Sequence, residues 1–302
     1  MTAIHLATSG GLLQLDESGT TRGIEFDGRE VVAVDARRDV VAVAVSGDGV
    51  WQRAHGDWRR IGLEEATVWT VALTDERVVY AGVEPAALWR LDNGNSSELT
   101  GLATVEGHED WYSPWGPADL STVVVDGDRL IVGVEVGGVA VSHDRGATWQ
   151  ARNRGLFEDV HVVLAAGECL YATTGMGCFA SRDEGRQWAW ASHGIDRGYT
   201  LGFARTGDGL VVGAASGPPP MWDAGGPEAA IFRADADGTR LEWVQVFDDF
   251  VGAIERHCLK AYRDLVIAGS TAGELLVSRD GGSSFHLVRS GLPAIHAVAI
   301  SE

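Results

Sequence analysis

Short apolar runs rich in β-branched residues alternate with glycine-containing turns along the whole chain. Examples are RLIVGVEVGGV (129–139), CLYATTGMGCF (169–179) and LVIAGSTAGEL (265–275), each of which breaks at glycine after the length of a single strand. The 40 glycines and only 8 prolines suit many tight turns. The pattern therefore predicts an all-β protein with almost no helix.

A polar motif follows each of these three runs. The segments VSHDRGATWQ (141–150), ASRDEGRQWA (180–189) and VSRDGGSSFH (277–286) all fit S-x-D-x-G-x-x-[WF]. Aspartate at this spacing can accept backbone N–H bonds, and glycine permits the tight turn, so we expect a structural role with the aromatic residue packed between units. The motif residues are Ser142, Asp144, Gly146, Trp149, Ser181, Asp183, Gly185, Trp188, Ser278, Asp280, Gly282 and Phe285.

Four weaker copies of the same unit complete a sevenfold repeat. They begin at IHLATSGGLLQLD (4–16), VVAVAVSGDGVWQR (40–53), VVYAGVEPAALWRLD (78–92) and GLVVGAASG (209–217). Four short strands in a unit of roughly 40 residues are the pattern of a β-propeller blade. The repeat predicts one domain over residues 1–302, a seven-bladed β-propeller with four-stranded antiparallel blades. Because 293–301 looks like an innermost strand with nothing after it, we expect the C-terminal strand to join the N-terminal blade and close the ring.

The motif resembles the aspartate box, or bacterial neuraminidase repeat, of sialidases, sortilin-type propellers and the photosystem II assembly factor of cyanobacteria and plants. The stretches VEPAALWRL, EVGGVAVSHDRGATWQARNRGL and DVHVVL are also similar to uncharacterised WD40/YVTN/BNR-like repeat proteins that are labelled sialidase-like. The resemblance implies the fold, since the repeat itself is structural. Sialidase chemistry is not expected, because the arginine-containing F-R-I-P segment of that family is missing and the first arginine, Arg22, lies in an outer-strand run.

Charge and cysteine content narrow the classes of partner. The formal net charge is -19 and Lys260 is the only lysine, so the protein should repel nucleic acids and anionic membranes. The N-terminal segment lacks a basic stretch followed by an apolar run, and no apolar run approaches the roughly 18 residues that a membrane span needs. We expect a cytoplasmic monomer in which Cys169, Cys178 and Cys258 are free thiols.

The binding site is expected at the mouth of the ring opposite the motif turns, where the connections can be elaborated. Two insertions, 104–119 and 216–230, are assigned to that face. Their aromatic residues either pin each loop locally or form a stacking surface for a sugar ring or a protein partner. These residues are Trp111, Tyr112, Trp115 and Trp222.

Polar candidates converge on the same mouth. Glu84, Glu135, Asp159 and His161 fall on equivalent connections of adjacent blades and are predicted to form the principal pocket. Three histidines occupy equivalent positions at the start of inner strands and, with nearby carboxylates, could hold a divalent metal; alternatively each histidine bonds a neighbouring loop. The residues at these equivalent positions are Trp69, Ser121, His161, His257 and His296.

Three classes of function remain open. A non-catalytic binding or assembly module that recognises a protein partner or a carbohydrate-like small molecule is favoured, because no activated nucleophile is evident. A glycosidase-like, carbohydrate-active enzyme could use Glu84 and Glu135 as its two carboxyl groups. A metal-dependent lyase or lactonase would use the histidines and glutamates of the mouth.

Overall fold

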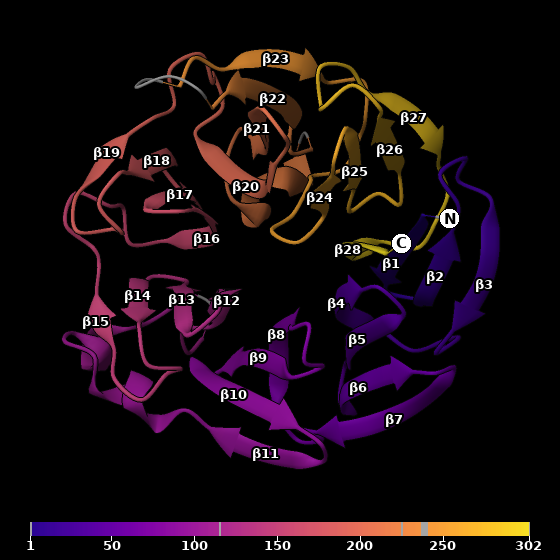
Figure 1. The fold of residues 1–302 in the computed structure, drawn as a ribbon. Coiled ribbons are helices and arrows are strands. Elements are labelled where there is room, and N and C mark those ends of the chain that lie inside the picture. The colour runs from indigo at the N-terminus through magenta and orange to yellow at the C-terminus, as the bar shows by residue number, and fades with distance from the viewer. Residues whose placement is uncertain (1, 115, 225, 237–240, 302) are drawn as a thin grey trace.

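The apolar runs form antiparallel strands that assemble into seven sheets of four strands each, arranged in a ring (Figure 1). This computed structural model describes residues 2–114, 116–224, 226–236 and 241–301. Each inner strand contacts the inner strands of both neighbouring blades, so the sheets surround a common axis. The predicted seven-bladed β-propeller is confirmed.

The blades follow one another along the chain, and the strands of each run in order from the channel to the rim. Blade one contains β28 (Ile295–Ser301), β1 (Ala3–Thr8), β2 (Gly11–Leu15) and β3 (Thr21–Glu25). Blade two contains β4 (Val31–Arg37), β5 (Val40–Val45), β6 (Gly49–Ala54) and β7 (Asp57–Gly62). Blade three contains β8 (Thr67–Leu73), β9 (Val79–Glu84), β10 (Ala87–Asp92) and β11 (Asn95–Glu98). Blade four contains β12 (Leu120–Asp126), β13 (Arg129–Val134), β14 (Gly138–Ser142) and β15 (Gln150–Ala151).

The remaining three blades repeat the arrangement. Blade five contains β16 (Val160–Ala166), β17 (Cys169–Thr174), β18 (Gly177–Ser181) and β19 (Trp188–Trp190). Blade six contains β20 (Tyr199–Arg205), β21 (Gly209–Ala215), β22 (Ala230–Asp235) and β23 (Val244–Phe247). Blade seven contains β24 (Leu259–Tyr262), β25 (Leu265–Gly269), β26 (Leu275–Ser278) and β27 (His286–Arg289). The two insertions carry short 3-10 helices, η1 (Thr100–Thr104), η2 (His108–Asp110) and η3 (Pro219–Ala224).

The C-terminal strand closes the ring, as the repeat pattern predicts. β28 pairs antiparallel with β1 along its length, with Ile4 opposite Ile300 and Leu6 opposite Val298. This pairing satisfies the edge of β1 and anchors both ends of the described chain in one sheet. Within the described residues, no helix is long and apolar enough to cross a membrane, and the three cysteines are free.

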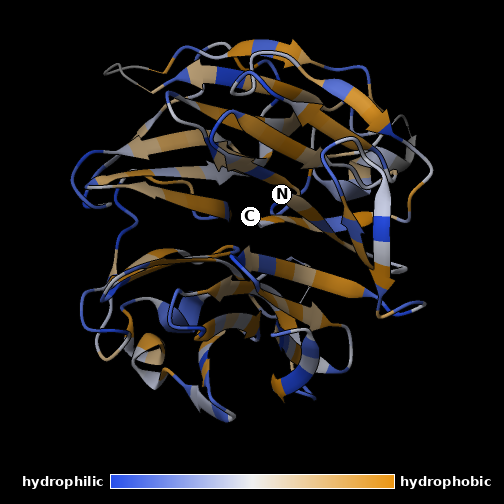
Figure 2. Cartoon of the chain, turned by 45° about the vertical axis from the view of Figure 1, so that its right-hand side comes forward, coloured by the Kyte–Doolittle hydropathy of each residue, from blue (hydrophilic) through white to orange (hydrophobic). Residues whose placement is uncertain are grey.

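The inner strands are apolar at consecutive positions because both faces of each sheet pack against a neighbouring blade. All six residues of β5 are buried. Glycine in the second strand permits the closest approach between blades. A Cβ added at Gly82 would lie 2.6 Å from Cδ2 of Leu120, and one at Gly269 would lie 2.5 Å from Cγ2 of Ile295. Figure 2 shows the apolar residues concentrated in the strands and the polar residues in the connections.

The three S-x-D-x-G motifs form the same hydrogen-bonded turn between third and fourth strands. In the turn of blade four, Ser142 Oγ accepts the Gly146 N–H at 2.8 Å and donates to Asp144 Oδ1 at 2.8 Å. The same oxygen of Asp144 accepts the Thr148 N–H at 2.8 Å. Blades five and seven repeat these bonds. Gly146 has a φ of 88°, a left-handed conformation that favours glycine.

The aromatic residue of each motif is buried between two blades. Trp149 is 8% exposed, packs in a cluster with Leu88 and Leu102 of the preceding unit, and donates its indole N–H to the Gly146 carbonyl. Trp188 and Phe285 are buried in the same way. The motif therefore both fixes a turn and contributes an aromatic side chain to the core between two blades.

The connections divide between two faces of the ring. We call the face with the second-to-third strand and outer-to-inner strand connections the mouth face, and the face with the three motif turns the turn face. Both insertions lie on the mouth face, as predicted: one joins β11 to β12 and the other joins β21 to β22.

Replacing Trp149 with alanine should lower the free energy of unfolding by roughly 3–5 kcal/mol, because deleting a buried large aromatic side chain loses its burial and leaves a cavity. Trp190, which is 51% exposed on outer strand β19, provides the matched control. Trp190→Ala should cost less than about 1 kcal/mol. Urea denaturation of the three proteins measures the difference, and equal stability of Trp149→Ala and wild type would contradict the assigned role.

Candidate functional site

In six of the seven blades, a β-bulge interrupts strand pairing near the start of the inner strand. The strand register shifts between Val68 and Thr70, between Leu120 and Thr122, and at the matching points of four other blades. The residues at these positions are Val32, Trp69, Ser121, His161, Leu201 and His296, and His257 takes the matching place in blade seven. The predicted alignment of the histidines with Trp69 and Ser121 thus matches the strand register; their role in binding stays a prediction.

All of these residues except Ser121 border a cavity of about 830 Å³, which we call the mouth cavity. Its walls come from inner-strand residues and from mouth-face connections of several blades. The connections contribute residues 46–47, 64–66, 135 and 255–257, and the insertion of blade six contributes Pro219. Among the predicted site residues, Trp69, Glu135, His161, His257 and His296 line this cavity.

Arg256 joins opposite sides of the ring inside the mouth cavity. It precedes β24 of blade seven, whereas its two acidic partners belong to blade four. Its Nη1 lies 2.7 Å from Asp119 Oδ1, and its Nη2 lies 2.7 Å from Glu135 Oε2. Its Cζ also lies 5.3 Å from the ring centroid of Trp69 in blade three. The guanidinium therefore connects three blades and compensates two carboxyl groups that are almost fully buried.

One positive charge is shared by two carboxyl groups, and this sets the protonation of Glu135. The pKa of Glu135 is raised to about 7, chiefly by burial and also by the charge and hydrogen bond of Asp119, while the charge of Arg256 opposes the shift. Burying a carboxylate without a counter-charge costs free energy. Because Arg256 supplies one positive charge, ionisation of the second carboxyl group of the pair is disfavoured. Near neutral pH the cluster is therefore poised to gain or lose a proton.

His161 is oriented by the neighbouring blade. Its Nδ1 lies 2.5 Å from the Thr200 carbonyl oxygen; since a carbonyl only accepts, Nδ1 carries the proton. Its Nε2 lies 3.5 Å from Asp159 Oδ1, and neither of these two buried atoms has a hydrogen-bond partner in the described structure. The Tyr199 ring packs 4.7 Å from the imidazole, centroid to centroid. Burial opposes ionisation of Asp159, but the proximity of the His161 imidazole lowers its pKa.

The other two histidines also have protein neighbours. Burial lowers the pKa of His257 to about 3, with a further contribution from the charges of Arg256 and Lys260, so this imidazole is neutral. His296 Nε2 lies 3.4 Å from Glu30 Oε1. Within the described ranges, no group of three or more His, Cys, Asp or Glu residues is arranged to hold a metal ion.

Glu84 and Asp159 do not line the mouth cavity but contact residues that do. Glu84 Oε2 accepts the Trp69 indole N–H at 3.0 Å, and Asp159 faces His161 as described above. Both side chains therefore position residues that border the cavity. The four predicted pocket residues are brought to one region, but only Glu135 and His161 reach the cavity surface.

Two of the insertion aromatics pack against their own surroundings, which agrees with the first of the two predicted alternatives, local pinning of the loop. Trp111 packs into the core cluster between blades three and four and against the His108 ring. Trp222 donates its indole N–H to the Gly217 carbonyl of its own loop at 2.7 Å and packs against the small apolar cluster that contains Leu201. These two rings pin their loops because each insertion must bury apolar surface of its own. Tyr112 is exposed outside the cavity lining, and Trp115 lies outside the described residues.

Sequence reasoning missed Arg256, Asp119 and Tyr199. Arg256 directly precedes His257, an aligned channel position, and is one of few cations in a strongly acidic chain. Asp119 is the last residue of an insertion that the sequence singled out. These two features draw attention to Arg256 and Asp119. The sequence repeat, however, relates only neighbouring blades, so it cannot predict that the two residues pair across the ring.

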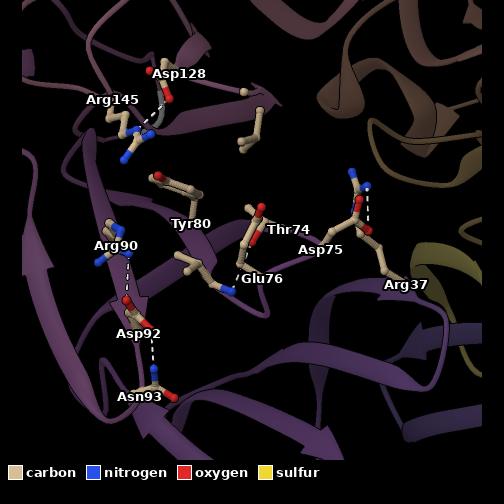
Figure 3. A pocket seen from close by; sticks show the side chains of 13 residues that line it. Arg37, Thr74, Asp75, Glu76, Tyr80, Arg90, Asp92, Asn93, Asp128 and Arg145 are labelled. Atoms are coloured by element: carbon tan, nitrogen blue, oxygen red, sulfur yellow. Dashed lines mark hydrogen bonds and ion pairs between the residues drawn. The ribbon is translucent and has the colours of Figure 1, made fainter.

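A second cavity, of about 540 Å³, lies on the turn face among blades two, three and four (Figure 3). Most of its charged groups pair with one another. Arg145 Nε lies 2.6 Å from Asp128 Oδ1, and Arg90 Nη2 lies 2.7 Å from Asp92 Oδ2. Because these ion pairs satisfy its polar lining, this cavity is a weaker candidate site than the mouth cavity.

Comparison with known proteins supports the fold. No family model matches the sequence, and no curated protein matches it. The GH74 xyloglucanase from Xanthomonas campestris superposes with a TM-score of 0.63 at 14% identity, over 95% of this chain and 47% of that one. YCF48 from Cyanidioschyzon merolae superposes with a TM-score of 0.61 at 12% identity, over 87% of both chains.

YCF48 bound to D1 peptide gives a TM-score of 0.64 at 14% identity, over 91% of this chain and 89% of that one. The chain spans about half the length of the xyloglucanase it matches. At these identities the likeness shows the fold alone.

Replacing Glu135 with glutamine should flatten the dependence of stability on pH. The folded protein holds the Glu135 proton up to about pH 7, whereas the unfolded chain releases it near its ordinary pKa of 4.5. The free energy of unfolding of the wild type therefore includes a component that falls as the pH rises through this window. Urea denaturation at several pH values from 4.5 to 8 measures the slope, and an unchanged slope in Glu135→Gln would contradict the assignment.

Replacing Arg256 with methionine should lower the free energy of unfolding by roughly 3 kcal/mol, because two buried carboxyl groups lose their counter-charge. The double variant Arg256→Met with Glu135→Gln should recover part of the loss, since it removes one of the uncompensated acids. Thermal and urea denaturation check both expectations. Wild-type stability of Arg256→Met, or no recovery in the double variant, would show that the ion pairs contribute little.

Proposed function

We propose that this protein is a non-catalytic binding module that docks a protein partner on its mouth face. The observation that carries the proposal is the distribution of exposed apolar side chains. Ten large hydrophobic residues are exposed in the described structure. Six lie on the mouth face, namely Trp69, Tyr112, Phe157, Met176, Met221 and Val251. The other four lie on outer strands, namely Ile24, Trp190, Val244 and Leu287, and no turn-face connection among the described residues carries one.

Such a distribution is typical of an interaction surface. Isolated exposed hydrophobic residues are ordinary, but a set gathered on one face around a cavity marks a place where another molecule removes them from water. Aromatic residues and methionine are also enriched in the cores of protein interfaces. The fold resemblance to YCF48, which has been solved bound to D1 peptide, agrees with a peptide or protein as the ligand.

The alternative of a carbohydrate-active enzyme has less support. Glycoside hydrolysis requires two carboxyl groups that face the sugar at a defined separation. Glu84 is held by the Trp69 indole, and Glu135 is held by Arg256 and Asp119. Both are engaged as positioning or structural groups. The metal-dependent lyase or lactonase loses support because the described residues contain no metal-ligand cluster.

The three S-x-D-x-G turns support the view that the chain is an aspartate-box propeller. Their aspartates accept backbone N–H groups within their own turns, on the face of the ring opposite the mouth connections. We assign them no part in binding. The proposal places recognition on one face and the structural motif on the other.

Removing apolar side chains from the mouth face should abolish capture of the partner. The test compares the double variant Met221→Ser with Val251→Ser against a matched outer-strand control, Val244→Ser with Leu287→Ser. Wild type and control, immobilised, should retain the same protein from a lysate of the source organism, and the mouth-face variant should retain it at least about tenfold less. Quantitative mass spectrometry measures retention. Equal capture by the mouth-face variant would place the interface elsewhere.

A further inference from the structure

Acidic groups outnumber basic groups among the charged side chains that line the mouth cavity. Its lining includes five glutamates, but Arg256 is the one guanidinium among its lining residues and no lysine borders it. Arg256 is already engaged with Asp119 and Glu135. The lining glutamates are Glu30, Glu64, Glu65, Glu135 and Glu255. The excess of acidic groups points to a ligand that donates hydrogen bonds.

Two of the lining glutamates form no ion pair in the described structure. Glu64 pairs with Arg60 at 3.2 Å, and Glu30 lies 3.4 Å from His296. Glu65 and Glu255, by contrast, form no side-chain hydrogen bond or ion pair among the described residues. They border the cavity on connections that reach it from blades two and seven. Each of them offers a carboxylate to a cation in the cavity without breaking an existing ion pair.

A buried acceptor also faces this cavity. His161 is 1% exposed, lines the cavity, and uses Nδ1–H to donate to Thr200. Its Nε2 has no hydrogen-bond partner among the described residues, and the neighbouring Asp159 Oδ1, another acceptor, has none either. Nε2 of His296, another residue of the lining, has no hydrogen-bond partner in the described structure either. A ligand that donates hydrogen bonds would satisfy the Asp159 carboxylate oxygen, which only accepts while it is ionised.

The cavity already shows how it accommodates a positive charge. Arg256 inserts its guanidinium between two carboxyl groups and over the Trp69 ring. Trp69 nevertheless remains 37% exposed, and Val32, Val68 and Leu201 provide apolar wall beside it. A long aliphatic stem that ends in a cation fits a lining of this composition, because the stem packs on the apolar wall while the head meets carboxylates.

We propose that the mouth cavity receives an arginine or lysine side chain of the docking partner. This inference rests on the proposed function and adds the chemistry of the docked segment: apolar residues contact the exposed hydrophobic residues of the mouth face, and one cationic side chain enters the cavity. The net charge of -19 also favours approach of a basic segment. Recognition of this kind would reject acidic segments by repulsion and by desolvation of unpaired carboxylates.

Short synthetic peptides test the inference without knowledge of the natural partner. The probes are acetyl-Gly-Leu-Xaa-Leu-Gly-amide peptides in which Xaa is arginine, lysine, citrulline or glutamate. Citrulline has nearly the shape of arginine but no charge. The readout is the indole N–H resonance of Trp69 in titrations followed by NMR, assigned by its loss in Trp69→Phe.

The arginine and lysine peptides should shift the Trp69 resonance saturably, with Kd at least about tenfold lower than for the citrulline and glutamate peptides. The double variant Glu65→Gln with Glu255→Gln should raise the Kd of the arginine peptide by about tenfold. The matched control, Asp75→Asn with Glu76→Gln, removes the same charge from the turn-face cavity and should leave that Kd unchanged.

Three results would overturn the inference: an unmoved Trp69 resonance with the arginine peptide, equal affinity for citrulline and arginine, or an unaffected Kd in Glu65→Gln with Glu255→Gln. None of these results would contradict docking on the mouth face, which is tested separately by partner capture with the apolar variants. If those variants lose the partner while the glutamine variant keeps it, docking on the mouth face stands and the cationic side chain is wrong. If peptide binding shows the predicted charge dependence but the apolar variants retain the partner, the cavity binds cations and the docking surface is elsewhere.

Discussion

The closeness with which seven inner strands pack around one axis is the constraint on which this structure depends. In four blades the next inner strand, or the residues just before it, packs against a glycine of the second strand, where no side chain would fit. A Cβ at Gly133 would lie 2.9 Å from Cγ1 of Val160, and one at Gly213 would lie 2.7 Å from Cβ of Ile254. The ring is therefore narrow, and pairing of β28 with β1 completes it. Several of the side chains at the bulges therefore border one shared cavity.

That narrowness explains why groups from distant blades form one electrostatic cluster. Arg256 of blade seven reaches Asp119 and Glu135 of blade four, more than a third of the chain away in sequence. Burial makes each charge costly unless it is compensated, and one guanidinium cannot fully compensate two carboxylates. The raised pKa of Glu135 follows from this imbalance. The cluster thus depends on ring closure, because any change in the spacing of blades four and seven would separate its charges.

The sequence predicts what is local and repeated. Ser142, Asp144 and Gly146 can be recognised in the sequence because their turn requires those side chains at that spacing. The alternation of strands and turns then predicts seven blades. The alignment also finds the inward positions of His161 and His296, since the bulge recurs with the repeat. The Arg256 cluster cannot be predicted from the repeat, because its contacts cross the ring between blades that are not neighbours. The insertion tryptophans look like surface groups in sequence, yet a long loop must bury part of itself to hold one conformation.

The two faces of the ring differ in how freely they can vary, and this places the binding surface. The turn face is committed to structure: in three blades its third-to-fourth strand turns are fixed by serine, aspartate and a left-handed glycine, and added residues would break those bonds. On the mouth face, Thr8 and Thr174 fix similar turns in two blades, but the connections of other blades differ in length. The insertions 104–119 and 216–230 both lie there. Exposed apolar side chains such as Met221 and Val251, which add nothing to the core, gather on the same face. Exposing these side chains to water costs free energy and does not stabilise the fold. Their presence on the mouth face therefore agrees with a docking surface there.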